Sequence, residues 1–130
     1  PFTAITCVDR LAAGLARLAR RRPPSAHRVG AAGRLRVIAR PATFPDMLDA
    51  AFNQIRQYGR SSAATLIRML EVIADLAAVV GADDDRRALR RHAEMVARAA
   101  EASLPEENDR RDVAARVAAI AKALGAPAAE

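Results

Sequence analysis

Aromatic residues and cysteine are scarce in this chain of 130 residues. The first shortage limits which side chains can form the core, and the second excludes sites that need several cysteines. Aromatic residues make up 3% of the chain and tryptophan is absent, so the core must come from Leu, Ile, Val, Met and three Phe. Because Cys7 is the only cysteine, an internal disulfide and a cluster of thiolate metal ligands are both excluded.

Long hydrophobic runs are also missing. No uncharged apolar stretch approaches the roughly 20 residues needed to cross a bilayer. Asp9 and Arg10 interrupt the one early apolar stretch that a signal peptide would require. We therefore expect the chain itself to be soluble and to contain no transmembrane segment.

The composition is basic and rich in alanine. The formal net charge is +6, and Lys122 is the only lysine among 21 cationic residues. Such a balance favours an anionic partner such as nucleic acid or a membrane surface, although abundant Ala and Arg are also typical of high-GC bacterial sequences. Alanine is the best helix former, which favours helices packed closely through small residues.

Apolar residues recur at helical spacing in five segments. The first helix is predicted over about residues 3–20 and ends before Pro23 and Pro24, which cannot continue it. The second should begin at Thr43, whose side chain can form a capping box with Asp46, and should end near Gly59.

The third predicted helix runs from Ser61 or Ser62 to Val80 and is apolar over most of its circumference, which is typical of the central helix of a bundle. Its narrow polar strip consists of Arg68, Glu71 and Asp75. A fourth helix should begin at the aspartates of residues 83–85 and end before Pro105, and a fifth should cover residues 108–124.

One β element is predicted between the first two helices. Leu35 and Val37 alternate with arginines, the pattern of a half-buried strand, and residues 27–29 can pair with it through the turn at 30–33. Because an isolated hairpin is marginal in water, we expect it to lean on the helices. The predicted fold is all-α or mainly α: a bundle of about five helices with one small β-hairpin, forming a single helical domain over residues 1–125 with a frayed tail at 126–130.

No pattern indicates a catalytic, cofactor-binding or metal-binding site. His27 lies in a predicted turn and His92 at the margin of an apolar helical face, and neither has ligating side chains at a useful spacing. The segment Gly30–Gly33 lacks the Lys-Ser/Thr of a phosphate-binding loop. We therefore predict no enzymatic activity, no cofactor and no metal.

The second predicted helix carries the most informative polar stripe. On a helix, four polar residues form one stripe with a fifth alongside: Asp49, Asn53, Arg56 and Arg60, with Gln57 beside them. Amide and guanidinium groups together can hold an anion or a partner's backbone. Alternatively, they cap or bridge neighbouring helices, with Asp49 or Asp9 as the counter-charge of an arginine.

Two segments resemble a known family. Pro1–Leu11 is similar to the Asp-Pro-Phe-Thr-Ala…Asp-Arg-Leu segment of a bacterial family of predicted membrane proteins, domain of unknown function 2254. Leu35–Pro41, followed by Asp49–Phe52 and Ile55–Gly59, resembles that family too, so the similarity covers roughly residues 1–80. The resemblance implies that this chain is the soluble C-terminal region that follows a membrane portion, and that the Ser-Pro-Gly-Ile-Asn-Asp segment of the family would precede Pro1.

These observations support two hypotheses of function. The first is a non-enzymatic interaction or assembly domain on the cytoplasmic side of a membrane-anchored protein, which contacts the membrane portion or another copy through apolar surface around Phe2 and Ile5. The second is a basic module that binds nucleic acid or another anionic ligand through an arginine patch. That patch would consist of Arg34, Arg36, Arg40, Arg56 and Arg60. Nucleic acid is disfavoured because Tyr58 is the only tyrosine, which leaves few side chains on which bases can stack.

Overall fold

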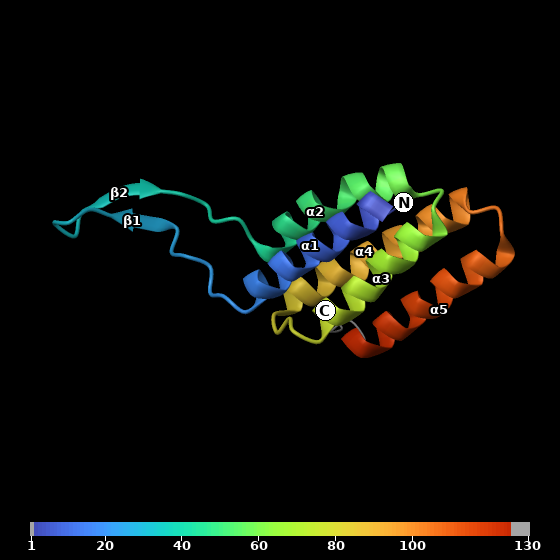
Figure 1. Cartoon of the computed structure of the whole chain (residues 1–130). Coiled ribbons are helices and arrows are strands. Elements are labelled where there is room, and N and C mark those ends of the chain that lie inside the picture. The colour runs from blue at the N-terminus through green and yellow to red at the C-terminus, as the bar shows by residue number, and fades with distance from the viewer. Residues whose placement is uncertain (1, 126–130) are drawn as a thin grey trace.

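The computed structural model describes residues 2–125, which form five helices and one two-stranded antiparallel hairpin (Figure 1). In chain order the elements are α1 (Phe2–Ala19), β1 (His27–Val29), β2 (Leu35–Ile38), α2 (Phe44–Gly59), α3 (Ala63–Ala77), α4 (Asp83–Ser103) and α5 (Glu107–Leu124). The predicted fold class, with the hairpin between the first two helices, is confirmed. The predicted frayed tail at 126–130 lies outside the described residues.

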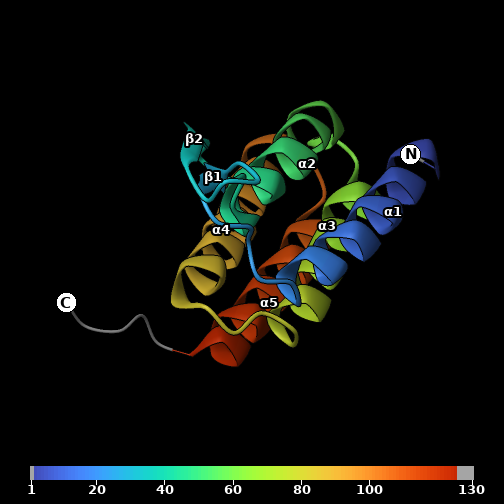
Figure 2. The ribbon, with the colours of Figure 1, turned by 90° about the vertical axis from the view of Figure 1, so that its left-hand side faces the viewer.

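Helix α3 occupies the centre of the bundle and contacts each of the other four helices (Figure 2). Its apolar residues point in most directions around the helix, and the largest of them, including Leu66, Met69 and Ile73, are fully buried. One hydrophobic cluster is thereby shared by all five helices. The prediction of a central third helix is confirmed, although the helix ends at Ala77 rather than at Val80.

The start of α2 is fixed by the predicted capping box. The Thr43 hydroxyl oxygen accepts a hydrogen bond from the Asp46 backbone N–H at 3.3 Å, and an Asp46 carboxylate oxygen accepts from the Thr43 backbone N–H at 3.0 Å. These bonds from Thr43 stabilise the ionised form and lower the pKa of Asp46. Ser62 caps α3 in a similar way, by accepting from the Thr65 backbone N–H.

The hairpin does not lean on the helices, so that expectation was wrong. Neither strand contacts a helix within residues 2–125, and all seven strand residues are exposed as the ribbon projects from one end of the bundle (Figure 1). The strands are held by their own backbone ladder, which continues to the Ala39 N–H donating to the Ala26 carbonyl at 2.8 Å. The apolar faces of the four outer helices already pack on α3, so the bundle completes its core without the hairpin.

Candidate functional site

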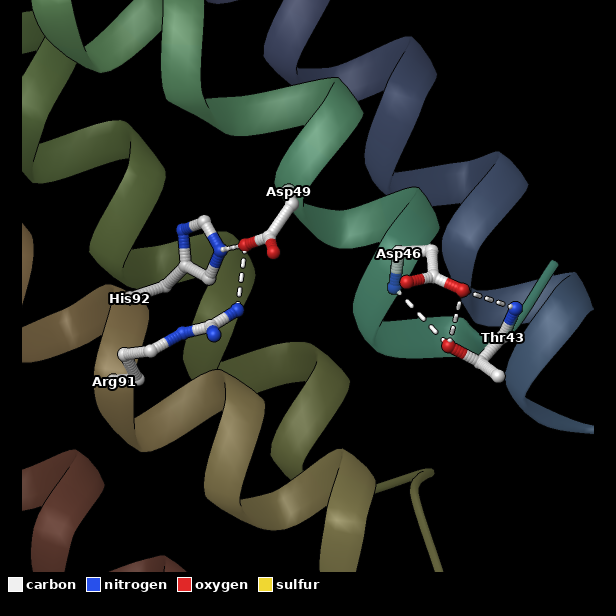
Figure 3. A network of polar contacts seen from close by, with 5 residues as sticks. All are labelled: Thr43, Asp46, Asp49, Arg91 and His92. Carbon is white, nitrogen blue, oxygen red and sulfur yellow. Dashed lines mark hydrogen bonds and ion pairs between the residues drawn. The ribbon is translucent and has the colours of Figure 1, made fainter.

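Two side-chain contacts that share one carboxylate oxygen join α2 to α4 (Figure 3). Asp49 of α2 projects toward α4 with its Oδ1 atom 2.6 Å from Nη2 of Arg91 and 2.7 Å from Nε2 of His92. One carboxylate oxygen thus bridges two consecutive residues of the neighbouring helix. The bridge links α2 to α4 beside the apolar residues through which the two helices pack.

His92 is completely buried, although it is a polar residue. Its ring lies edge-on to Phe52, with the ring centroids 6.0 Å apart and the planes at 80°. Burial lowers the pKa of His92, although the bond with Asp49 acts in the opposite direction. The neutral ring therefore donates from Nε2 to Asp49, and its Nδ1 atom has no hydrogen-bond partner within the described part of the chain.

The other residues of the predicted polar stripe divide between the interior and the surface. Asn53 and Arg56 are half-buried, and Asn53 Oδ1 and Arg56 Nε are enclosed without a hydrogen-bond partner among residues 2–125. The positive charges of Arg91 and Arg56 also contribute to the lowered pKa of His92. Gln57 and Arg60 are exposed. The binding role of this stripe stays a prediction.

Sequence reasoning missed the partners of Asp49, because Arg91 and His92 lie 42 and 43 residues further along the chain. The available signal was the position of His92 between Leu89, Ala93 and Val96 on the apolar side of α4. A histidine at a buried position requires a hydrogen-bond partner. The sequence alone does not say which acidic residue supplies it. The other proposed counter-charge, Asp9, lies 2.6 Å from Arg68 of α3.

The bridge has a limited chemical repertoire. In some active sites, a neutral histidine oriented by a carboxylate acts as the general base that activates a nucleophilic side chain. His92, however, is enclosed by the protein. Its remaining ring nitrogen has no side-chain nucleophile within hydrogen-bonding distance among residues 2–125. In that same range, no three His, Cys, Asp or Glu side chains are grouped so that they could hold a metal ion. The arrangement is suited to linking two helices.

A basic cleft of about 840 Å³ opens where the hairpin leaves the bundle. It is bounded by the end of α1, the starts of α2 and α4, and the segments that lead into and out of the hairpin. Five arginines and three aspartates line it: Arg21, Arg22, Arg40, Arg87 and Arg91, with Asp46, Asp84 and Asp85. Arg87 pairs with Asp84 and Arg91 with Asp49, whereas the other three arginines make no ion pair with any residue that the structure describes.

A smaller, mostly apolar groove of about 430 Å³ lies at the opposite end of α2, between residues such as Ala4, Ile55 and Thr65. Tyr58 at its edge and Phe2 of α1 are 87% and 83% exposed. This end of the bundle therefore presents large apolar side chains to solvent. Coverage of these side chains by another copy stays a prediction.

The five arginines of the alternative hypothesis do not form one patch. Arg34 and Arg36 belong to the hairpin and Arg40 to the segment that leads into α2. Arg56 and Arg60 lie near the other end of α2, which spans about 24 Å for its 16 residues. The predicted single patch is wrong because α2 separates its members.

Fold and surfaces together define a mainly helical bundle domain with a projecting basic hairpin. The family described as predicted membrane protein DUF2254 matches residues 1–75, more than half of the chain, and the chain belongs to this family. The resemblance inferred from the sequence is thereby confirmed. No curated protein and no solved structure gave a significant match. Within residues 2–125, none of the helices combines the length and the apolar character that crossing a bilayer requires.

Proposed function

We propose that this chain is a non-enzymatic interaction domain on the cytoplasmic side of a membrane protein, and that the hairpin is its contact element. The observation that carries the proposal is the exposure of every strand residue on a ribbon that touches no helix within the described residues 2–125. A two-stranded ribbon alone is marginally stable in water, so a partner that covers it would stabilise it.

Two further properties support this assignment. The hairpin exposes Val29, Leu35, Val37 and Ile38, and contiguous exposed apolar side chains are typical of surfaces that bind a partner. The arginine excess favours the cytoplasmic side, because membrane proteins retain cationic residues there. The free Cys7 agrees with a reducing compartment.

Cysteine labelling in the intact membrane protein tests the contact. We would replace the exposed Cys7 by serine and introduce either Val37→Cys in the hairpin or Ala118→Cys on the exposed side of α5 as the matched control. In the isolated chain both cysteines should react equally fast with a water-soluble maleimide. In opened membranes containing the whole protein, the cysteine at 37 should react several times more slowly than the one at 118.

Equal reaction at both positions in the membranes would contradict the assignment of the hairpin as a contact element. The side of the membrane is tested with the same variants in intact cells. An impermeant reagent added outside should label neither cysteine. Labelling at position 118 from outside would refute the cytoplasmic location.

A further inference from the structure

Positive charge is concentrated in one continuous part of the chain. Residues 10–45 contain nine arginines and no aspartate or glutamate, whereas the rest of the chain has 12 cationic and 15 acidic residues. Seven of these nine arginines lie in residues 20–40, which comprise the hairpin and its two connecting segments. We call these residues the basic arm. The domain therefore has one strongly positive projection on an otherwise slightly acidic body.

The arginines of the basic arm are free to meet an external anion. All seven are exposed. None of them makes an ion pair with an acidic side chain in residues 2–125. Arg21, Arg22 and Arg40 line the cleft at the root of the hairpin and come from both connecting segments. Three aspartates line the same cleft, so a lipid phosphate is expected on the projecting part of the arm.

The basic arm also carries apolar side chains in a defined arrangement. Val29 pairs with Leu35 across the ladder and His27 pairs with Ile38, so Val29, Leu35 and Ile38 share one face of the ribbon. The register shifts by one residue between Arg28 and Val29, so Val37, which pairs with Arg28, belongs to the opposite face. These four side chains are between 51% and 67% exposed. Short aliphatic side chains beside arginines match the boundary of a bilayer, where the hydrocarbon begins just beneath the phosphates.

We propose that the basic arm docks on the surface of an anionic phospholipid bilayer, with its arginines on lipid phosphates and its aliphatic side chains in the interfacial layer. The inference rests on the proposed function, because it names the partner of the hairpin. Membership of a membrane-protein family keeps such a surface close to the domain. The cytoplasmic leaflet is anionic and attracts basic segments.

Nucleic acid fits the basic arm less well, although it too is a polyanion. Residues 3–43 contain no Phe, Tyr or Trp on which a base can stack, and His27 is the one aromatic ring in this range. Exposed Val, Leu and Ile side chains contribute little beside a phosphate backbone, whereas they gain from transfer into lipid. Binding of an RNA oligomer is therefore an outcome that the experiment must separate.

The test is flotation of the 130-residue chain with lipid vesicles. One preparation is phosphatidylcholine alone, and the other contains equal amounts of phosphatidylglycerol and phosphatidylcholine. The wild-type chain should float with the anionic vesicles only. Arg34→Gln with Arg36→Gln should lower the partition coefficient roughly 30-fold, from about fivefold for each arginine near the surface. Val37→Ser with Ile38→Ser should also weaken flotation.

The matched control is Arg98→Gln with Arg111→Gln, which changes the net charge equally on the exposed surfaces of α4 and α5. It should stay within about twofold of the wild type because charges beyond a Debye length are screened. The arm variants should unfold as the wild type does, since the strands contact none of the helices in residues 2–125. The control variant loses the exposed pair of Arg111 with Glu107, and a surface ion pair of this kind contributes little to stability. Equal losses in the arm and control variants would overturn the proposal, because binding would then follow net charge alone.

If the wild-type chain does not float with anionic vesicles, the proposal of bilayer docking is overturned. If it instead binds a single-stranded RNA oligomer, and the arm variants bind that oligomer less well, nucleic acid is the partner. These failures differ from failure of the proposed function. If vesicles do not bind but position 37 is still protected in the intact protein, the partner is another protein and the contact role stands. If position 37 is unprotected, the contact role itself is wrong.

Discussion

Lowering the pH should destabilise this fold through one buried side chain, His92. The ring is enclosed, donates to Asp49 and packs edge-on to Phe52, and its burial lowers the pKa of the imidazole below the ordinary value of 6.5. In the unfolded chain the same ring takes up a proton near that ordinary value. The unfolded state therefore binds more protons between 6.5 and the lowered pKa, so stability falls as the pH falls through that window.

The size of the effect follows from the linkage of one proton. A single site that protonates only in the unfolded chain changes the free energy of unfolding by at most about 1.4 kcal/mol per pH unit. Between pH 7.5 and 5.5 the loss is at most about 1.4 kcal/mol, the limit in which only the unfolded ring takes up a proton in this interval.

Urea unfolding at the two pH values measures this loss. His92→Gln is neutral at both and can still donate to Asp49, so it should lose less stability than the wild type over the same interval. His27→Gln is the matched control, because it removes the histidine of the exposed hairpin and should keep the wild-type pH dependence. An equal loss in His92→Gln and wild type would refute the reasoning that places a neutral, buried imidazole at this position.

Three further changes test the packing and the helix starts. Ile73→Ala at the centre of α3 should lower the free energy of unfolding by about 2–5 kcal/mol, because the smaller side chain leaves a cavity. Arg98→Ala on the surface should lower it by less than about 0.5 kcal/mol. Equal effects of the two changes in chemical denaturation would mean that α3 is not the centre of the bundle. Gly59→Ala should lower the free energy of unfolding by about 1–3 kcal/mol, because the added Cβ would lie 2.8 Å from Cγ2 of the buried Thr65. Thermal unfolding of this variant at the wild-type temperature would contradict the prediction. Thr43→Ala should cost about 1 kcal/mol by removing the capping box of α2, and Thr43→Ser, which keeps the hydroxyl, should largely restore it in the same assay.

The helices were predictable because their signals are local. The capping box at Thr43, the proline pair that follows α1 and the nearly uniform apolar surface of α3 each act within a few residues. The boundaries differ only slightly from expectation: α5 begins at Glu107 rather than Asn108, and α3 ends at Ala77. In such cases local propensity, capping and burial favour the same structure.

Two features depended on information that the sequence pattern does not contain. Alternation of Leu35 and Val37 with arginines indicates a strand, but it cannot say whether a helix is available to cover the apolar face. In this fold the helices cover one another around α3. The bridge from Asp49 to His92 depends on which turns of α2 and α4 meet, and tertiary packing decides this across 43 residues.

The central position of α3 has a consequence for the part of the chain that the family match covers. The match ends at residue 75, within a helix that packs on α1 and α2 and also on α4 and α5. Helices α4 and α5 lie outside the matched region, yet they pack on α3 and contribute residues to the shared hydrophobic core. The matched segment by itself would therefore leave the side of α3 that faces these two helices in contact with water, so α4 and α5 complete the core of the family segment.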